Sequence, residues 1–287
     1  MGDKGRGWNL GLAGLLTPVT IWLGLFFLVP LLLILAYSFG TSDVYGGITL
    51  GFNPSNYLRV FDPLYLQIIV RTFFIAALNT VLCLVLGYPL AYFIVFKGYR
   101  RRNILILLVM VPFWTSLLIR AYSWVVILSG NGIANKFLQF IGITDEPLTL
   151  IFTPEAVLMG MVYSYLPFMI LPLYASLEKF DTRLKEAAKD LGASRWQTFW
   201  RVTFPLSMPG VIAGSILVFI PSAGEFVIPQ LLGGSRTVMT GTLIQTQFGP
   251  ARDWAFGSAL SVMLAVLLLA AILFYVRRVG TDKLGGM

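Results

Sequence analysis

An acidic residue inside an apolar run is the position at which chemistry is most readily expected in this sequence. Glu225 lies between Gly224 and Pro229, where a helix is easily broken. An ionisable group within a membrane span is costly, and such groups commonly serve a function. Glu225 could bind a cation, pair with Arg120 or with a lysine of a partner chain, or lie in the outer headgroup region as a structural residue.

A cation and two aromatic rings add to the candidates. Arg120 interrupts another apolar run, where it could line a pathway or extend its charged group to the membrane surface. Trp114 and Tyr122 flank it in the sequence, and the faces of aromatic rings attract cations. These three residues and Glu225 are the predicted residues of a substrate pathway, although aromatic residues more often serve helix packing and membrane interfaces.

The composition excludes several kinds of active site. The sequence has no histidine, so catalytic triads and zinc sites that depend on histidine are absent. Its one cysteine, Cys83, lies in an apolar run and cannot form a disulfide within the chain. The phosphate-binding pattern G-x-x-x-x-G-K-[ST] does not occur. We therefore expect no catalytic residues, no metal site and no ATP hydrolysis by this chain alone.

The longest polar segment between two apolar runs extends from Asp181 to Pro209. Its first part has apolar residues at helical spacing, which form one stripe: Leu184, Ala187, Ala188 and Leu191. Gly192 can adopt the left-handed conformation that ends a helix. Ser194 and Gln197 have the spacing of a capping box, which starts a second helix. From spacing alone, this segment could dock into a groove of another protein or lie on the bilayer surface.

The elements that carry these residues are predicted to be membrane-spanning helices. Of the 287 residues, 57% are hydrophobic and 12% are charged, and the mean hydropathy is +0.81. Soluble domains contain about 25% charged residues. Six apolar segments can cross a bilayer core of about 30 Å as helices: Leu12–Phe39, Thr72–Phe96, Ile104–Leu128, Ala156–Leu177, Leu206–Ile228 and Phe256–Val276. We therefore predict an all-α integral membrane protein, with a single membrane domain over residues 1–287.

The positive charges predict the orientation of these helices. Fifteen Lys and Arg residues lie at the two termini and in the second-to-third and fourth-to-fifth connections, against four in the other connections. Cytoplasmic connections carry the excess of positive charge in membrane proteins. Both termini and residues 181–209 are therefore predicted to be cytoplasmic. The net charge of +8 is then explained by contact with membrane lipid rather than with nucleic acid.

Two runs resemble the EAA motif of bacterial ABC-importer permeases. E-A-A-K-D-L-G at Glu186–Gly192 corresponds to the first half of the motif. F-P-L-S-M-P-G at Phe204–Gly210 corresponds to the second half, with Phe204 where leucine is usual. The likeness extends over nearly the whole chain and is strongest to the permeases of spermidine/putrescine importers. The runs that show this likeness to the spermidine/putrescine permeases are Cys83–Pro89, Val111–Arg120, Leu166–Tyr174 and Gly224–Gly234.

The resemblance implies the type I ABC-importer permease fold in a bacterial inner membrane, with helices 2–6 at residues 70–279 as the transport core. It implies a small cationic solute, most of all a polyamine, although related subfamilies move opines, aminophosphonates or ferric iron. The implied partners are two ATP-binding subunits that hold ATP and Mg²⁺, a second permease that we expect to be a different chain, and an external solute-binding protein. In this family, the helix with Glu186, Ala187 and Ala188, ended by Gly192, would couple to the ATP-binding subunits.

Two other classes of function are alternatives at this point. An ion-coupled secondary transporter often shows internal repeats, and we find none in the sequence. It would also be expected to carry acidic residues at several midplane positions, and these are not apparent. An intramembrane enzyme would need a catalytic pair, and no such pair is visible.

The charge distribution makes a testable prediction of topology. Positions 98 and 194 should be cytoplasmic and positions 47 and 235 external, because positive charge is retained on the cytoplasmic side. In a Cys83→Ala background, single cysteines replacing Gly47 and Ser235 should react with a membrane-impermeant thiol reagent in intact cells. Cysteines replacing Gly98 and Ser194 should react only after the membrane is opened. Labelling of position 194 from outside would contradict the orientation.

Overall fold

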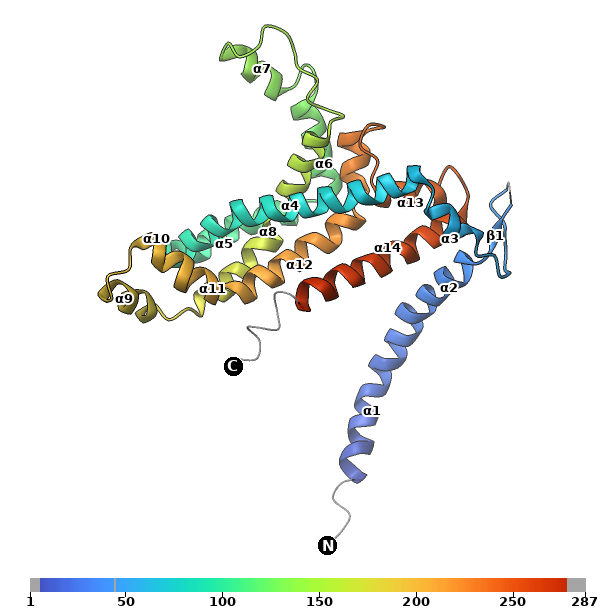
Figure 1. Cartoon of the computed structure of the whole chain (residues 1–287), viewed down its shortest axis with the longest axis horizontal. Helices are drawn as coiled ribbons and strands as arrows, with labels where there is room; N and C mark the ends of the chain where they lie inside the picture. The colour runs from blue at the N-terminus through green and yellow to red at the C-terminus, as the bar shows by residue number, and fades with distance from the viewer. Residues whose placement is uncertain (1–5, 44, 278–287) are drawn as a thin grey trace. The chain divides into compact units, whose positions relative to one another are not determined.

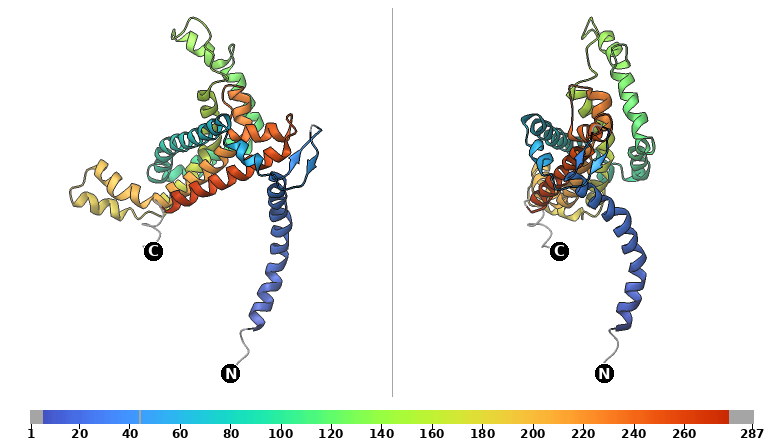
Figure 2. Two further views of the ribbon diagram at one scale, coloured as in Figure 1. Left: turned by 45° about the vertical axis from the view of Figure 1, so that its right-hand side comes forward. Right: turned by 90° about the vertical axis from the view of Figure 1, so that its right-hand side faces the viewer.

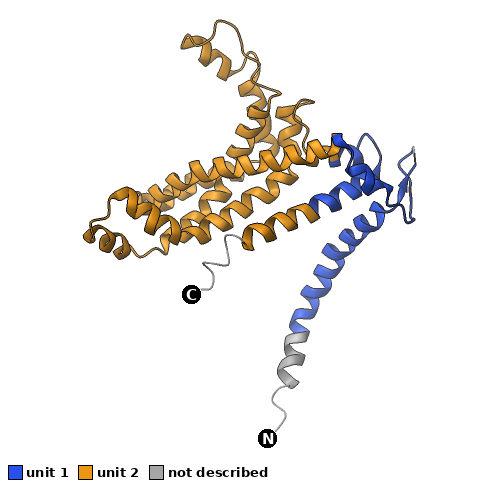
Figure 3. Cartoon of the chain, viewed as in Figure 1, with its two compact units in different colours: residues 1–63, 244–265 blue, residues 64–243, 266–287 orange. Residues whose placement is uncertain are grey.

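The computed structural model describes residues 6–43 and 45–277, and its regular structure is almost entirely helical (Figure 1). Within these residues, β-structure is limited to a hairpin of two antiparallel strands, β1 (Thr41–Ser42) and β2 (Ile48–Thr49). The chain divides into two compact units (Figure 3). Unit 1 comprises residues 1–63 and 244–265, and unit 2 comprises residues 64–243 and 266–287.

Unit 1 starts with a long apolar helix. Its successive segments are α1 (Arg6–Leu23), a π-helical turn (Gly24–Leu28) and α2 (Val29–Ser38). From Gly14 to Ser38 this helix is long and apolar enough to cross a membrane. The hydroxyl groups of Ser38 and Tyr57 share a hydrogen bond of 2.7 Å, which ties α3 (Ser55–Val60) to the end of α2.

The same unit contains the beginning of α14 (Trp254–Tyr275). Arg59 of α3 donates a hydrogen bond of 2.7 Å to Asp253, just before this helix. The guanidinium of Arg59 also lies 4.0 Å from the ring centroid of Phe256, which is fully buried. An ion pair and a cation–π contact therefore join α3 to the start of α14.

Unit 2 carries most of the remaining apolar segments. Its long helices are α4 (Pro63–Phe96), α8 (Pro154–Glu178) and α12 (Met208–Gly224). Its shorter helices are α5 (Arg102–Met110), α6 (Leu117–Leu128) and α7 (Ile133–Phe140), and α13 (Thr240–Phe248) begins in it. Tight or wide helical turns occur at Tyr99–Arg101, Val111–Trp114 and Pro229–Gly233. At one end of this unit lie α9 (Arg183–Asp190), α10 (Arg195–Thr198), a π-helical turn (Phe199–Thr203) and α11 (Phe204–Leu206) (Figures 1 and 2).

The predicted spans correspond to helices, with two corrections. Among the described residues, five helices are long and apolar enough to cross a membrane, or six if Arg195–Leu206 and Met208–Gly224, which are bent by 64°, count as one span. A continuous helix over Ile104–Leu128 is wrong, because the turn at Val111–Trp114 separates α5 from α6. Pro112 explains this break, since proline has no N–H for the helical hydrogen bond. The predicted fifth helix ends at Gly224 instead of Ile228.

The core of unit 2 is formed where α8 packs against α12. Met169 and Leu173 of α8 are fully buried. A Cβ atom at Gly210 would lie 2.6 Å from the Cβ of Ser176, and one at Gly214 would lie 2.7 Å from the Sδ of Met169. Small residues allow the backbones of membrane helices to approach closely, and dispersion contacts then hold the pair together. The glycines of α12 therefore set its distance from α8.

Hydrogen bonds between side chains connect α4 to its neighbours. They join Thr72 to Thr240 (2.9 Å), Asn79 to Ser222 (2.7 Å) and Tyr88 to Ser207 (2.8 Å). In apolar surroundings, an unpaired polar group is costly, so each pair favours one arrangement of the helices.

The close approach of α12 to α8 predicts that Gly210→Ala destabilises the protein. The added methyl group would meet the Pro172 carbonyl oxygen at 2.7 Å as well as Ser176, and overpacking of this kind costs about 1–3 kcal/mol. Gly224→Ala is the matched control, because no atom lies within 4 Å of the added group. Thermal unfolding of the purified protein should show a lower midpoint for Gly210→Ala alone. Equal midpoints for both variants would show that the packing is not close.

Candidate functional site

The polar segment from Asp181 to Pro209 has the predicted helix–turn–helix structure. Helix α9 is followed by Gly192, whose φ of +83° is in the left-handed region. Ser194 Oγ accepts the N–H of Gln197 (3.2 Å), and Gln197 Oε1 accepts the N–H of Ser194 (2.9 Å). The glycine turn and the capping box are therefore both confirmed.

The apolar stripe of α9 is uncovered in this chain. Leu184 is 46% exposed and Leu191 is 89% exposed. Between them, Ala187 is exposed and Ala188 is half-buried, and the neighbouring Glu186 is exposed. A short helix with a flat, exposed face of small and apolar residues is suited to contact with another protein.

Glu225 lies at the break that follows α12. Its backbone is extended (φ −66°, ψ 134°), and its side chain is buried, with 6% exposed. Oε1 accepts hydrogen bonds from the backbone N–H groups of the next three residues, at 2.9 to 3.5 Å. Oε2 accepts a short hydrogen bond from the hydroxyl of Tyr165 on α8. The carboxylate therefore caps the helical turn that begins after the break, as an acidic side chain does at a helix N-terminus.

Arg120 is also buried, with 9% of its surface exposed. It lies in the first turn of α6, rather than near the outer end of a continuous third helix, because the turn at Val111–Trp114 interrupts that helix. Extension of its charged group to the membrane surface does not agree with this burial. Its Nε and Nη1 atoms are buried without a hydrogen-bond partner among the described residues. Arg120 also lies close enough to Tyr165 to interact with it electrostatically.

The predicted aromatic residues of the pathway lie outside this buried group. Trp114 is 72% exposed and Tyr122 is 57% exposed. The structure therefore brings Glu225 together with Tyr165, and Tyr165 near Arg120, but it does not bury Trp114 and Tyr122 with them. Tyr165 is not among the pathway residues predicted from the sequence. Its bond to Glu225 joins residues 60 positions apart, for which the sequence carries no local signal.

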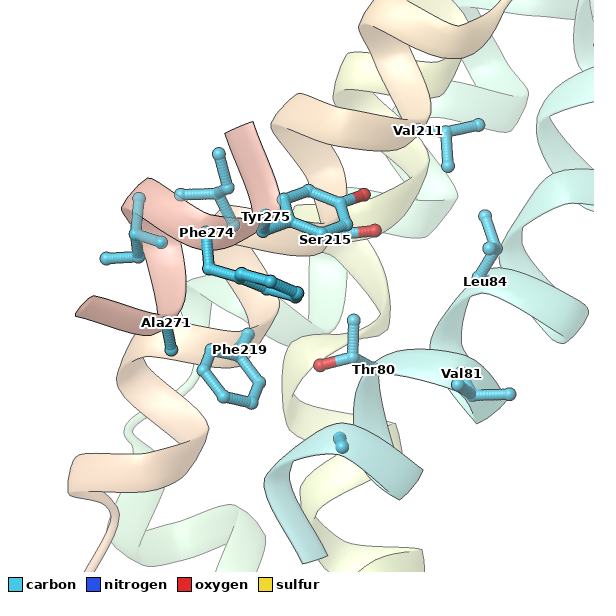
Figure 4. Close-up of a pocket in the computed structure, with 12 residues that line it drawn as sticks. Thr80, Val81, Leu84, Val211, Ser215, Phe219, Ala271, Phe274 and Tyr275 are labelled. Atoms are coloured by element: carbon cyan, nitrogen blue, oxygen red, sulfur yellow. The ribbon is translucent and has the colours of Figure 1, made fainter. Parts of the chain in front are cut away.

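An apolar cavity of about 440 Å³ lies among α4, α12 and α14 (Figure 4). Its lining is apolar apart from the hydroxyl-bearing residues Thr80, Ser215 and Tyr275. It has no charged residue in its lining, and none of the predicted pathway residues contributes to it. A solute with several positive charges would lose its hydration there without a counter-charge, so this cavity does not suit a polycation.

Comparisons with known proteins agree with the fold. Residues 13–280 match the family described as binding-protein-dependent transport system inner membrane component. The chain is 43% identical over 263 residues to the spermidine/putrescine transport system permease protein PotB of Escherichia coli (strain K12). The aligned region covers 92% of this chain and 96% of that protein. It is 44% identical over 256 residues to PotB of Haemophilus influenzae, over 89% of this chain and 90% of that protein.

Among solved structures, the chain is similar to that of a bacterial ABC transporter involved in the import of alginate. The TM-score is 0.74 at 21% identity, over 96% of this chain and 97% of that chain. A second structure of a bacterial alginate ABC transporter is a complex with a periplasmic protein that carries an alginate pentasaccharide, with a TM-score of 0.73. These likenesses confirm the predicted fold.

The predicted multi-pass location in the inner membrane is also confirmed, as is a role in transport rather than in enzymatic catalysis. The match over residues 13–280 and the identity to PotB lead to one conclusion about the family. The chain belongs to the inner membrane components of binding-protein-dependent transport systems, and it is a permease subunit of an ABC importer.

Proposed function

We propose that this permease transports a polyamine, such as spermidine or putrescine, in a bacterial ABC importer. The observation that carries this proposal is the 43% identity to PotB, which extends over 92% of the chain. The similarity is spread over the spans and connections rather than confined to the ATPase-coupling motif. For this reason a polyamine is favoured over an opine, an aminophosphonate or ferric iron.

The buried acid supports a cationic solute. Glu225 accepts hydrogen bonds only from neutral N–H and O–H donors of the described residues, and only 6% of it is exposed. An ammonium group that replaced the Tyr165 hydroxyl at Oε2 would form a charge-assisted hydrogen bond, which is stronger than the bond it replaces. Arg120 would balance the acid while no solute is bound. The exposed rings of Trp114 and Tyr122 would offer cation–π contacts along the path.

The partners follow from the same assignment. The transport core is proposed to extend over residues 70–279, with a second, different permease completing the pathway. An external solute-binding protein would deliver the polyamine, and two ATP-binding subunits would hold ATP and Mg²⁺. The stripe of α9 that includes Ala187 and Ala188, together with the exposed Glu186, is proposed to dock into a groove of one ATP-binding subunit.

Docking of α9 predicts that Ala187→Arg separates the permease from the ATP-binding subunit. A large side chain in a contact without spare volume costs about 1–3 kcal/mol, and here it would act at the interface rather than in the core. The variant should insert normally, but less ATP-binding subunit should be retained in co-purification, and uptake should fall. Normal uptake by Ala187→Arg at normal expression would refute the docking role.

The glycine turn provides a control for this experiment. No atom lies within 4 Å of a Cβ added at Gly192, so substitution there acts through the positive φ alone. Asparagine adopts positive φ more readily than a β-branched residue does. Gly192→Asn should therefore retain more ATP-binding subunit than Gly192→Val.

Contact of the solute with Glu225 predicts that Glu225→Gln lowers polyamine uptake much more than it lowers assembly or basal ATP hydrolysis. Glutamine keeps an acceptor for the N–H groups that follow the break, but it removes the negative charge. Tyr165→Phe is the comparison variant, because it removes the bond to Oε2 and leaves the charge in place. We expect it to retain more uptake than Glu225→Gln.

The measurement is uptake of labelled putrescine into proteoliposomes that contain the whole transporter, with the binding protein and ATP supplied. Wild-type uptake by Glu225→Gln would assign Glu225 to a purely structural role. If the binding protein of this system prefers an anion, the polyamine assignment fails, and only the permease role stands.

A further inference from the structure

One basic residue of the proposed docking helix differs from the others. Of the three basic residues in α9, Arg183 and Lys189 are exposed, whereas Lys185 is half-buried. The Nζ atom of Lys185 lies 2.9 Å from the ring centroid of Phe96 and 4.6 Å from that of Tyr92. Both distances are within the range of a cation–π interaction. Lys185 therefore points back to the end of α4 and away from the exposed stripe.

Three rings from two separate segments surround the ammonium group. Tyr92 and Phe96 are one turn apart at the end of α4, with ring centroids separated by 4.7 Å. Phe180, in the connection between α8 and α9, lies 5.2 Å from Nζ, and its ring is perpendicular to that of Phe96. Nζ also donates a hydrogen bond of 3.4 Å to the hydroxyl of Tyr92. We call these three rings the aromatic seat.

The charge of Lys185 is balanced by rings instead of by an acid. Its contacts in the described part of the chain are the aromatic seat and the Tyr92 hydroxyl. Burial lowers the pKa of Lys185 to about 8, and repulsion from Lys189 contributes to the same shift. The ring faces act in the opposite direction, because they attract the ammonium form. With a pKa of about 8, Lys185 still carries its charge in most molecules at pH 7.

The second arm of the cytoplasmic segment meets the same part of α4. Phe199, in the π-helical turn after α10, packs against Tyr88 at 5.5 Å and against Tyr92 at 6.4 Å between ring centroids. Tyr92 thus contacts both Lys185 of α9 and Phe199 in the turn that follows α10. Helices as short as α9, with 8 residues, are not stable on their own in water, so contacts of this kind must hold it in place.

We propose that Lys185 is a positioning residue, which fixes α9 to the end of α4 through the aromatic seat so that a displacement of α9 is transmitted to that span. The inference rests on the docking role proposed above for α9. It adds a specific point of attachment inside the permease, separate from the surface that would meet the ATP-binding subunit. A helix anchored to a span transmits motion, whereas a helix free to turn on its connections does not.

The test compares Lys185→Ala with Lys189→Ala in the complete transporter. Both variants remove one lysine from the same helix and change helix propensity equally, but only Lys185 contacts the aromatic seat. In Lys185→Ala, amide hydrogen exchange in α9 should rise about three- to tenfold, as expected for loss of one such contact. Polyamine uptake per ATP hydrolysed should fall, while the ATP-binding subunits are retained. Lys189→Ala should leave amide exchange and uptake per ATP unchanged. Lys185→Arg should keep both near their wild-type values, since arginine also stacks on rings.

A double-mutant cycle with Phe96→Leu identifies the contact itself. If the seat acts through Phe96, Lys185→Ala should have little further effect on exchange or on uptake per ATP in the Phe96→Leu background. Wild-type exchange and uptake per ATP in Lys185→Ala, or fully additive effects of the two substitutions, would overturn the proposal. The docking role fails separately, if Ala187→Arg keeps its ATP-binding subunits. Loss of those subunits from Ala187→Arg, with no effect of Lys185→Ala, would overturn the positioning role alone.

Discussion

The need to satisfy backbone hydrogen-bonding groups without water is the constraint on which the structure of this permease depends. Inside a bilayer core each free N–H costs several kcal/mol, by an order-of-magnitude figure, so every interruption of a helix needs a local partner. At the break after α12 that partner is Glu225, whose Oε1 accepts three consecutive N–H groups. A hydroxyl or amide side chain could do the same, but it would not place a carboxyl group in this buried position.

The capping role of Glu225 and the transport role proposed for it are compatible because they use different oxygens. Oε1 is occupied by the backbone, and removing it would leave N–H groups unpaired. Oε2 is held by one neutral donor, the Tyr165 hydroxyl, which a cationic group can replace without opening the cap. The Nε and Nη1 atoms of Arg120, which lies near Tyr165, have no hydrogen-bond partner among the described residues. An acceptor group from another subunit of the transporter would satisfy these donors.

The sequence predicts the features that depend on local patterns, and it misses those that depend on contacts between distant residues. Apolar length identifies the spans, Gly192 predicts a positive φ, and the spacing of Ser194 and Gln197 predicts the capping box. The extent of the break after Pro112 was not predicted, because a proline inside a helix can kink it or end it. Lys185 could not be distinguished from the other basic residues of its segment, because the rings of its seat are far away in the sequence.

Helix α4 connects the two regions for which a function is proposed. Its 34 residues span about 50 Å at 1.5 Å per residue, with the aromatic seat at its end. Further along, Asn79 donates a hydrogen bond of 2.7 Å to Ser222, whose carbonyl oxygen accepts the N–H of Glu225 at 3.4 Å. Pro89 lies between these two points and removes one helical hydrogen bond, so bending of α4 is easiest there. If Lys185 anchors α9 to α4 as proposed, a displacement of α9 would reach the break at Glu225 through one helix and two hydrogen bonds, and its direction would depend on the bend at Pro89.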